Sequence, residues 1–199
     1  MISKMFFFNF IKNKRNLFLK FLIPFVIVTA SFQVGYGKIT LVMLLIFAVI
    51  TGSGLKVIKL KTSGIYNRLI ISPFKKSSLF SEIVIITSFF YFLQFIPTLI
   101  IASLYDSFLI ILYSLIAIFI VVLIGTLIGI HAKSLGEIHL YSIIFLIPLI
   151  ALTMINNSFS YILPFAAIFR SNYTIYTFIY PCIIALVLLF VLIIDSKRL

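Results

Sequence analysis

Acidic residues and cysteines are scarce in this chain of 199 residues, and each scarcity excludes a class of chemistry. Cys182 is the only cysteine, so neither a disulfide nor a thiolate metal site can form within one chain. The acidic residues are Glu82, Asp106, Glu137 and Asp195. Two of these four fall at the ends of apolar runs, so the sequence provides no buried carboxylate relay of the kind that proton-coupled pumps use.

Catalytic motifs are also absent. The sequence contains no G-x-x-x-x-G-K-[ST] phosphate-binding loop, no H-E-x-x-H and no G-x-S-x-G. The spacing of His131, Glu137 and His139 matches no familiar zinc pattern, and at least one further ligand is missing. We therefore expect a chain that is not an enzyme by itself and that binds no metal or other cofactor.

Hydrophobic residues make up 63% of the chain, charged residues 10%, and the mean hydropathy is +1.30. This composition excludes a soluble domain. At ~20 residues per transmembrane helix, the length accommodates about six spans and leaves no room for a nucleotide-binding domain. We predict an all-α integral membrane protein with a single transmembrane domain, residues 1–199. The apolar runs place its six transmembrane helices at 17–32, 39–55, 79–103, 108–130, 140–154 and 175–194.

The net charge of +12 would suggest a nucleic-acid partner in a soluble protein. In a membrane protein, the positive-inside rule and anionic lipid explain it better, so we expect the lipid bilayer and no nucleic acid as a partner. Of the sixteen basic residues, all but Lys38 and Arg170 fall on one side of the predicted map. This asymmetry predicts a multi-pass protein of the plasma membrane with both termini in the cytoplasm.

A polar segment, Lys56–Ser78, separates two long apolar runs and carries six of the sixteen basic residues but no acidic one. Its simplest interpretation is an anchor for membrane topology. Ile65 and Leu69 can share one face of a short helix, with Gly64 before it and Pro73 after it as start and stop signals. Such an amphipathic helix would lie on the cytoplasmic surface, where it could dock a soluble partner.

The order SGIYNRLIISP at 63–73 resembles the loop after the second span in type-two, export-type ABC transporter permeases. In that family a glycine, a short helix ending in Arg-Leu and a Ser/Thr-Pro pair form the coupling helix, which sits in a cleft of a separate ATPase subunit. The resemblance assigns this coupling role to Gly64, Ile65, Tyr66, Arg68, Leu69, Ser72 and Pro73. The family commonly has acidic residues just before the glycine, where this chain has Lys59, Lys61 and Thr62.

In the N-terminal segment 3–16, a phenylalanine-rich run is followed by basic residues. It predicts either an amphipathic helix lying flat on the inner leaflet or a disordered basic leader. The resemblance favours the first, because type-two permeases carry an elbow helix before the first span. The residues expected to form it are Phe6, Phe10, Lys12, Lys14 and Arg15.

Small residues mark two helices. Gly125 and Gly129 form a GxxxG face that predicts close approach of a neighbouring helix without saying which one. Gly52 and Ser53, near the end of the second predicted span, favour close packing, or else a widened and hydrated inner mouth that lines a transport pathway.

The segment 155–174 is semi-polar but contains an apolar stretch of about half a span. A stretch of that length is more often re-entrant or interfacial than spanning. It resembles the pair of short extracellular helices that, in type-two permeases, dips back between the last two spans and lines the exit of the pathway. Asn156 and Asn157 would then contribute to the pathway lining.

The resemblance implies a permease subunit of an ATP-driven exporter that moves an amphiphilic cargo, such as a drug, a peptide or a lipid-like molecule. Separate nucleotide-binding ATPase subunits would hold ATP and Mg, and a second permease copy or a paralogue would complete a homo- or heterodimer. ATP would close the ATPase pair and push the coupling helix, so that the first, second and fifth spans rotate. The alternative is an ATP-independent channel, secondary carrier or immunity-type binding protein, in which Lys56–Ser78 only anchors the chain.

Overall fold

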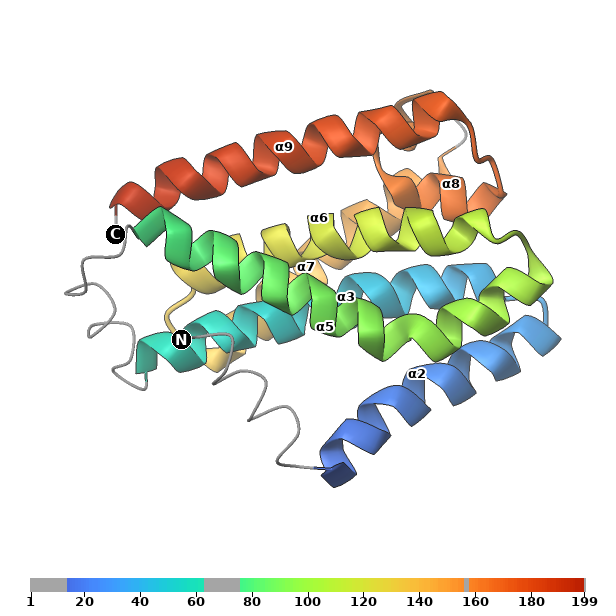
Figure 1. Ribbon diagram of the computed structural model, residues 1–199, viewed down its shortest axis with the longest axis horizontal. Helices are drawn as coiled ribbons and strands as arrows, with labels where there is room; N and C mark the ends of the chain where they lie inside the picture. Colours follow the sequence, from blue (N-terminus) through green and yellow to red (C-terminus); the bar gives the residue numbers. More distant parts are fainter. Residues whose placement is uncertain (1–13, 63–75, 156–157, 199) are drawn as a thin grey trace.

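The computed structural model describes residues 14–62, 76–155 and 158–198, and over these ranges the chain forms helices and no strands (Figure 1). Six of the helices are long and two are short. The elements are α2 (Lys14–Gln33), α3 (Gly37–Thr62), α5 (Lys76–Tyr105), α6 (Leu109–His131), α7 (Leu135–Met154), η1 (Ser158–Ile162), α8 (Pro164–Arg170) and α9 (Ile175–Arg198).

The six long helices alternate in direction along the bundle (Figure 1). The turns α2–α3 and α5–α6, together with η1 and α8, lie at the right-hand end of Figure 1. The end of α3, the turn α6–α7 and the end of α9 lie at the left-hand end, and α2 begins near the middle of the lower edge. The two ends of the bundle therefore collect different parts of the sequence.

Local hydrogen bonds end the helices at the right-hand end. Gly35 has φ +87°, and the backbone N–H groups of Gly35 and Tyr36 donate to Phe32 and Ser31 at 3.2 and 2.9 Å, which is the Schellman pattern that satisfies the last carbonyls of α2. Ser171 ends α8 in the same left-handed conformation, with φ 55°. These short connections reverse the chain within a few residues.

A capping box begins α7. The Ser134 hydroxyl accepts from the Glu137 backbone N–H at 3.2 Å, and the Glu137 carboxylate accepts from the Lys133 backbone N–H at 2.7 Å. The helix therefore starts at Leu135, earlier than the predicted start of the fifth span at residue 140. Glu137, one of the residues considered for a metal site, serves here as part of this cap.

Two further boundaries differ from the sequence-based expectation. α3 continues through Lys56–Thr62, which we expected to belong to the cytoplasmic loop. α2 begins at Lys14, so the backbone of Lys14 and Arg15 belongs to the same helix as the predicted first span. The remaining residues of the predicted elbow and the predicted coupling helix at 64–73 lie outside the described residues.

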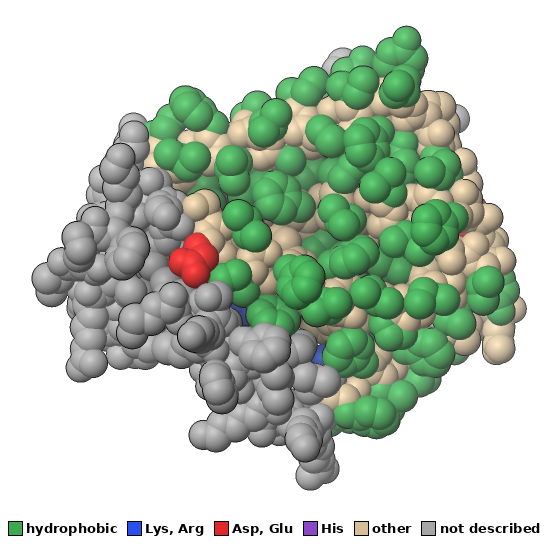
Figure 2. All heavy atoms as spheres, viewed as in Figure 1, with side chains coloured by type: hydrophobic (Ala, Val, Ile, Leu, Met, Phe, Trp, Pro, Cys, Tyr) green, Lys and Arg blue, Asp and Glu red, His purple; other side chains and the backbone are tan. Residues whose placement is uncertain are grey.

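Five described helices are long and apolar enough to cross a membrane: Gly37–Thr62, Phe80–Tyr105, Leu109–His131, Leu135–Met154 and Ile175–Asp195. Phe18–Gln33 is a shorter apolar helix. Only 17% of the apolar window of α7 and 22% of that of α9 is buried in the chain, so their apolar faces point outward. On the described part of the face in Figure 2, apolar side chains far outnumber charged ones. The chain is a multi-pass helical membrane protein.

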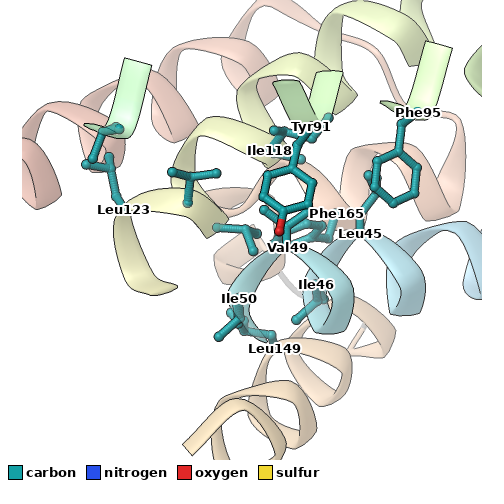
Figure 3. Close-up of a cluster of buried hydrophobic side chains, with 14 of the residues drawn as sticks. Leu45, Ile46, Val49, Ile50, Tyr91, Phe95, Ile118, Leu123, Leu149 and Phe165 are labelled. Carbon is teal, nitrogen blue, oxygen red and sulfur yellow. The ribbon is translucent and has the colours of Figure 1, made fainter. Parts of the chain in front are cut away.

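The core is built around α6, which contacts α3, α5, α7, α8 and α9. Figure 3 shows how side chains from four other helices converge near it: Leu45, Ile46, Val49 and Ile50 of α3, Tyr91 and Phe95 of α5, Leu149 of α7 and Phe165 of α8. Because lipid is as apolar as these side chains, close packing rather than exclusion from water holds such helices together.

The GxxxG face of α6 packs against α3, which identifies the neighbour that the sequence left open. A Cβ on Gly125 would lie 2.6 Å from the Ile50 carbonyl oxygen. A Cβ on Gly129 would lie 2.8 Å from both the Gly54 carbonyl oxygen and the Val57 Cβ. The two backbones are therefore in contact where these glycines lie, and neither position has room for a methyl group.

We expect Gly129→Ala to destabilise the protein and Gly136→Ala to leave it unchanged or slightly more stable. At Gly129 the added methyl group meets backbone, so α3 and α6 must separate, with a cost of about 1–3 kcal/mol. Gly136 is exposed at the start of α7, where a Cβ would meet only the Ser134 hydroxyl at 3.9 Å. Thermal unfolding of both variants in the same detergent measures the difference, and equal melting temperatures would contradict the packing assignment.

Candidate functional site

A cleft of about 410 Å³ lies between α2, α3 and α5. All three helices contribute side chains to it, and both apolar and basic groups are present. It is lined by Lys20, Phe47, Ala48, Thr51, Gly52, Leu55, Lys56, Lys59, Phe90, Tyr91 and Gln94. Its basic residues come from the beginning of α2 and the end of α3, which places that part of the cleft toward the left-hand end of Figure 1.

Lys56 points across the cleft toward the aromatic side chains of α5. Its Nζ lies 4.9 Å from the centre of the Tyr91 ring and 6.0 Å from that of Phe90. The negative face of an aromatic ring attracts a cation at such distances, and the attraction grows when water is excluded. The two rings thus help to hold a lysine within the helical bundle.

Two contacts give the cleft its shape. Gly52 has no side chain, and the Tyr91 hydroxyl occupies the space that a Cβ would fill; such a Cβ would also lie 2.9 Å from the Tyr91 Cζ. On the other wall, the Gln94 Nε2 donates to the Lys20 carbonyl oxygen at 3.2 Å and so ties α5 to α2.

Gly52 and Ser53, which were predicted together, have different surroundings. Gly52 lines the cleft. Ser53 is 2% exposed, and its hydroxyl donates to the Val49 and Ile50 carbonyls at 2.7 and 3.1 Å. Ser53 also faces Gly125 of α6, so it belongs to the helix contact. Asn156 and Asn157 lie outside the described residues.

A polar cluster closes the opposite end of the bundle. The Lys38 Nζ donates to the Asp106 Oδ1 at 2.8 Å, and the hydroxyls of Ser171 and Tyr173 also donate to that carboxylate. The cluster joins the first turn of α3, the turn before α6 and the segment between α8 and α9. Both charged members came from predicted outer turns, and the sequence did not pair them.

The cluster changes the acidity of its members. Burial alone would raise the pKa of Asp106, but the hydrogen bonds from Lys38, Ser171 and Tyr173 and the charge of Lys38 hold that pKa below its usual value. Burial and the hydrogen bond to Asp106 raise the pKa of Tyr173. At neutral pH the carboxylate is therefore ionised and the phenol is protonated, as this network requires.

At the left-hand end, the His131 Nε2 lies 2.6 Å from the Asp195 Oδ2, which connects the end of α6 to the end of α9. His131 thus pairs with a carboxylate far along the chain. Within the described part of the chain, no three His, Cys, Asp or Glu side chains gather as a metal site would require.

Sequence reasoning missed the convergence of Lys20, Lys56 and Lys59. Lys20 falls within the predicted first span, 17–32, and the other two lysines fall within the predicted loop Lys56–Ser78. A signal was present, because Gly52, Lys56 and Lys59 have the i, i+4, i+7 spacing of one helical face. It could be used only if the second span was known to continue through these lysines, as α3 does.

The coupling residues Gly64, Ile65, Tyr66, Arg68, Leu69, Ser72 and Pro73 and the elbow residues Phe6, Phe10 and Lys12 lie outside the described residues, so their assignment stays a prediction. No family model, curated protein or solved structure matches this chain.

We expect Asp106→Asn to destabilise the protein at neutral pH by about 1–3 kcal/mol, because Lys38 loses a charged partner. The pKa of Asp106 is lower in the folded than in the unfolded chain. Asp106 therefore contributes to the free energy of unfolding above its unfolded-state pKa, and this contribution is lost as the pH falls through its folded-state pKa. Melting temperatures measured from pH 7 down to pH 2 should fall less steeply below about pH 4 in Asp106→Asn than in the native chain. A native slope in Asp106→Asn would contradict the assignment.

Proposed function

We propose that this chain is the membrane-spanning permease subunit of an ATP-driven exporter, with six spans and both termini in the cytoplasm. One observation carries the proposal: α3 contacts both α2 and α7, so the second long helix lies beside the first and the fifth. The mechanism inferred from the resemblance requires these three spans to move together. α3 also leads directly into 63–75, which holds the predicted coupling helix.

The contacts of α3 suggest how a displacement at its end would be transmitted to the other helices. Beyond the glycine contact, the Lys61 Nζ donates to the Ile130 carbonyl oxygen near the end of α6. α3 and α6 are thus joined over much of their length, and they would move as one unit. A displacement at the end of α3 would then reach α5 and α9 through α6.

The segment between α7 and α9 fits the short helices that the proposal places at the outer exit. η1 and α8 lie at the right-hand end, away from the end of α3 and the start of α5 (Figure 1). Phe165 and Ile168 of α8 are fully buried, and α8 contacts α3, α6 and α7. The Arg170 guanidinium donates to the Ser160 hydroxyl at 3.0 Å and to the Ile155 carbonyl, which fixes α8 to the chain before it. Movement of α3 or α7 would therefore shift this segment.

The exposed apolar faces of α7 and α9 leave room for a second permease copy or a paralogue beside lipid. In the proposal, an amphiphilic cargo crosses between two such subunits. The nucleotide-binding subunits hold ATP and Mg, and this chain transmits their movement without catalysing a reaction.

We expect the chain to co-purify with an ATPase subunit encoded beside it and to stimulate ATP hydrolysis in lipid nanodiscs. Gly64→Pro and Arg68→Glu should reduce that stimulation to the rate of the ATPase alone, because they break the predicted coupling helix or reverse its charge. Lys133→Glu is the matched control, since Lys133 is an exposed basic residue in another turn at the same end. It should leave the stimulation unchanged.

The outcome separates the two functional classes. If no ATPase binds and both coupling variants behave like the native chain in the membrane, the loop is only a topological anchor, and ATP-independent transport or immunity replaces the proposal. If Lys133→Glu reduces the stimulation of ATP hydrolysis as much as Arg68→Glu does, the reduction comes from the change of charge at this end of the bundle and not from loss of a coupling helix.

A labelling experiment tests the orientation. Because Cys182 is the only cysteine, Cys182→Ser provides a cysteine-free background. In intact cells, a membrane-impermeant maleimide should label Tyr36→Cys in this background and should label Lys133→Cys only after the cells are opened. Tyr36 is 67% exposed in the turn before α3, and Lys133 is exposed in the turn before α7. The reverse pattern would invert the proposed topology.

A further inference from the structure

The cleft between α2, α3 and α5 concentrates positive charge. Lys20, Lys56 and Lys59 all line it, and none of the described side chains in its wall is acidic. Lys20 and Lys56 are close enough to repel each other. Lys20 and Lys59 are exposed and Lys56 is half-buried, and an anion bound among the three lysines would offset their repulsion.

The rest of the wall is suited to a chain of methylene groups. Phe47, Ala48 and Leu55 of α3 and Phe90 of α5 supply apolar surface beside the lysines. A purely ionic ligand would leave this surface uncovered. The lining therefore fits a molecule with an anionic head and an apolar tail.

Polar groups between these two zones could receive the linking region of such a molecule. Thr51 is 8% exposed and lines the cleft, and its Oγ1 has no hydrogen-bond partner among the described residues. Buried hydroxyls normally find a partner. The Oγ1 atom itself is not exposed to the cleft, so the Thr51 side chain would have to rotate to meet a ligand oxygen. The Tyr91 hydroxyl lies in the same wall, against Gly52.

We propose that this cleft binds an anionic phospholipid from the leaflet at the left-hand end of the bundle. The phosphate lies among the three lysines, the ester region near Thr51, and the upper part of an acyl chain along Phe47 and Leu55. The cleft volume of about 410 Å³ falls within the range of ligand sites, roughly 300–1,000 Å³, and suits a headgroup with the first part of its tail.

A lipid fits this site better than a free anion does. Phe47 is 39% exposed, so the apolar wall continues onto the surface of the bundle, where a tail can leave sideways into the bilayer. Free phosphate would use only the lysines. The proposal concerns lipid binding and holds whether or not an ATPase couples to the chain.

Tryptophan fluorescence gives a local test, because the native chain contains no tryptophan. Phe47→Trp places one reporter in the cleft. Phe145→Trp on α7 is the matched control, since Phe145 is 42% exposed but lies outside the cleft. Each variant is reconstituted with brominated phosphatidylglycerol or brominated phosphatidylcholine, and quenching gives the relative affinity of the two lipids at that position.

We expect a several-fold preference for phosphatidylglycerol at Phe47→Trp and little preference at Phe145→Trp. Adding Lys20→Gln, Lys56→Gln or Lys59→Gln to the cleft reporter should lower the preference by up to about five-fold each. Lys133→Gln, which removes an exposed lysine outside the cleft, should leave it unchanged. Equal preference at the two reporters, or a preference that survives neutralisation of all three cleft lysines, would overturn the proposal.

Two further arms complete the test. If millimolar inorganic phosphate abolishes the preference, the site binds a free anion and the lipid assignment is wrong. Mass spectrometry of the intact native chain, released gently from detergent, gives a readout without tryptophan. The native chain should retain phosphatidylglycerol, whereas Lys20→Gln combined with Lys59→Gln should lose it; equal retention would contradict the proposal.

Discussion

The contact between α3 and α6 at Gly125 and Gly129 is the constraint on which the rest of the structure depends. Hydrophobic burial cannot select one helix pair in lipid, since every apolar face is equally well solvated there. Steric fit can select a pair, because only helices without side chains at the contact bring their backbones this close. Once α3 lies against α6, the other faces of α3 are left for α2, α5, α7 and α8.

That placement also accounts for the cleft. The face of α3 that carries Ser53 and Gly54 is used against α6, so the neighbouring face with Gly52 and Lys56 turns toward α2 and α5. Tyr91 fills part of the gap over Gly52, and the lysines line the remainder. The same small residues that allow one tight contact thus leave, a fraction of a turn away, a space that the described residues do not fill.

The sequence predicted the class of fold well because long apolar runs have few structural solutions in a membrane. The ends of the helices were harder to predict. Lys56–Thr62 is basic and was assigned to a loop, but a helix can extend beyond the hydrocarbon without losing its backbone hydrogen bonds. The ion pair between Lys38 and Asp106 could not be predicted, because it depends on how two distant turns meet. The coupling role of residues 64–73 rests on the sequence resemblance, because these residues lie outside the described part of the chain.

The lysines at the end of α3 show why charge alone is a poor guide to function here. The positive-inside rule would be satisfied by a basic residue anywhere in the following loop, so topology does not explain why Lys56 lies over Tyr91 within the bundle. Holding a cation there has a cost in desolvation that a loop lysine avoids. The two aromatic rings offset part of that cost, and an anionic headgroup would offset more. The position of Lys56 is therefore explained by its packing against α5 rather than by orientation in the membrane, and the proposed lipid would add a further partner.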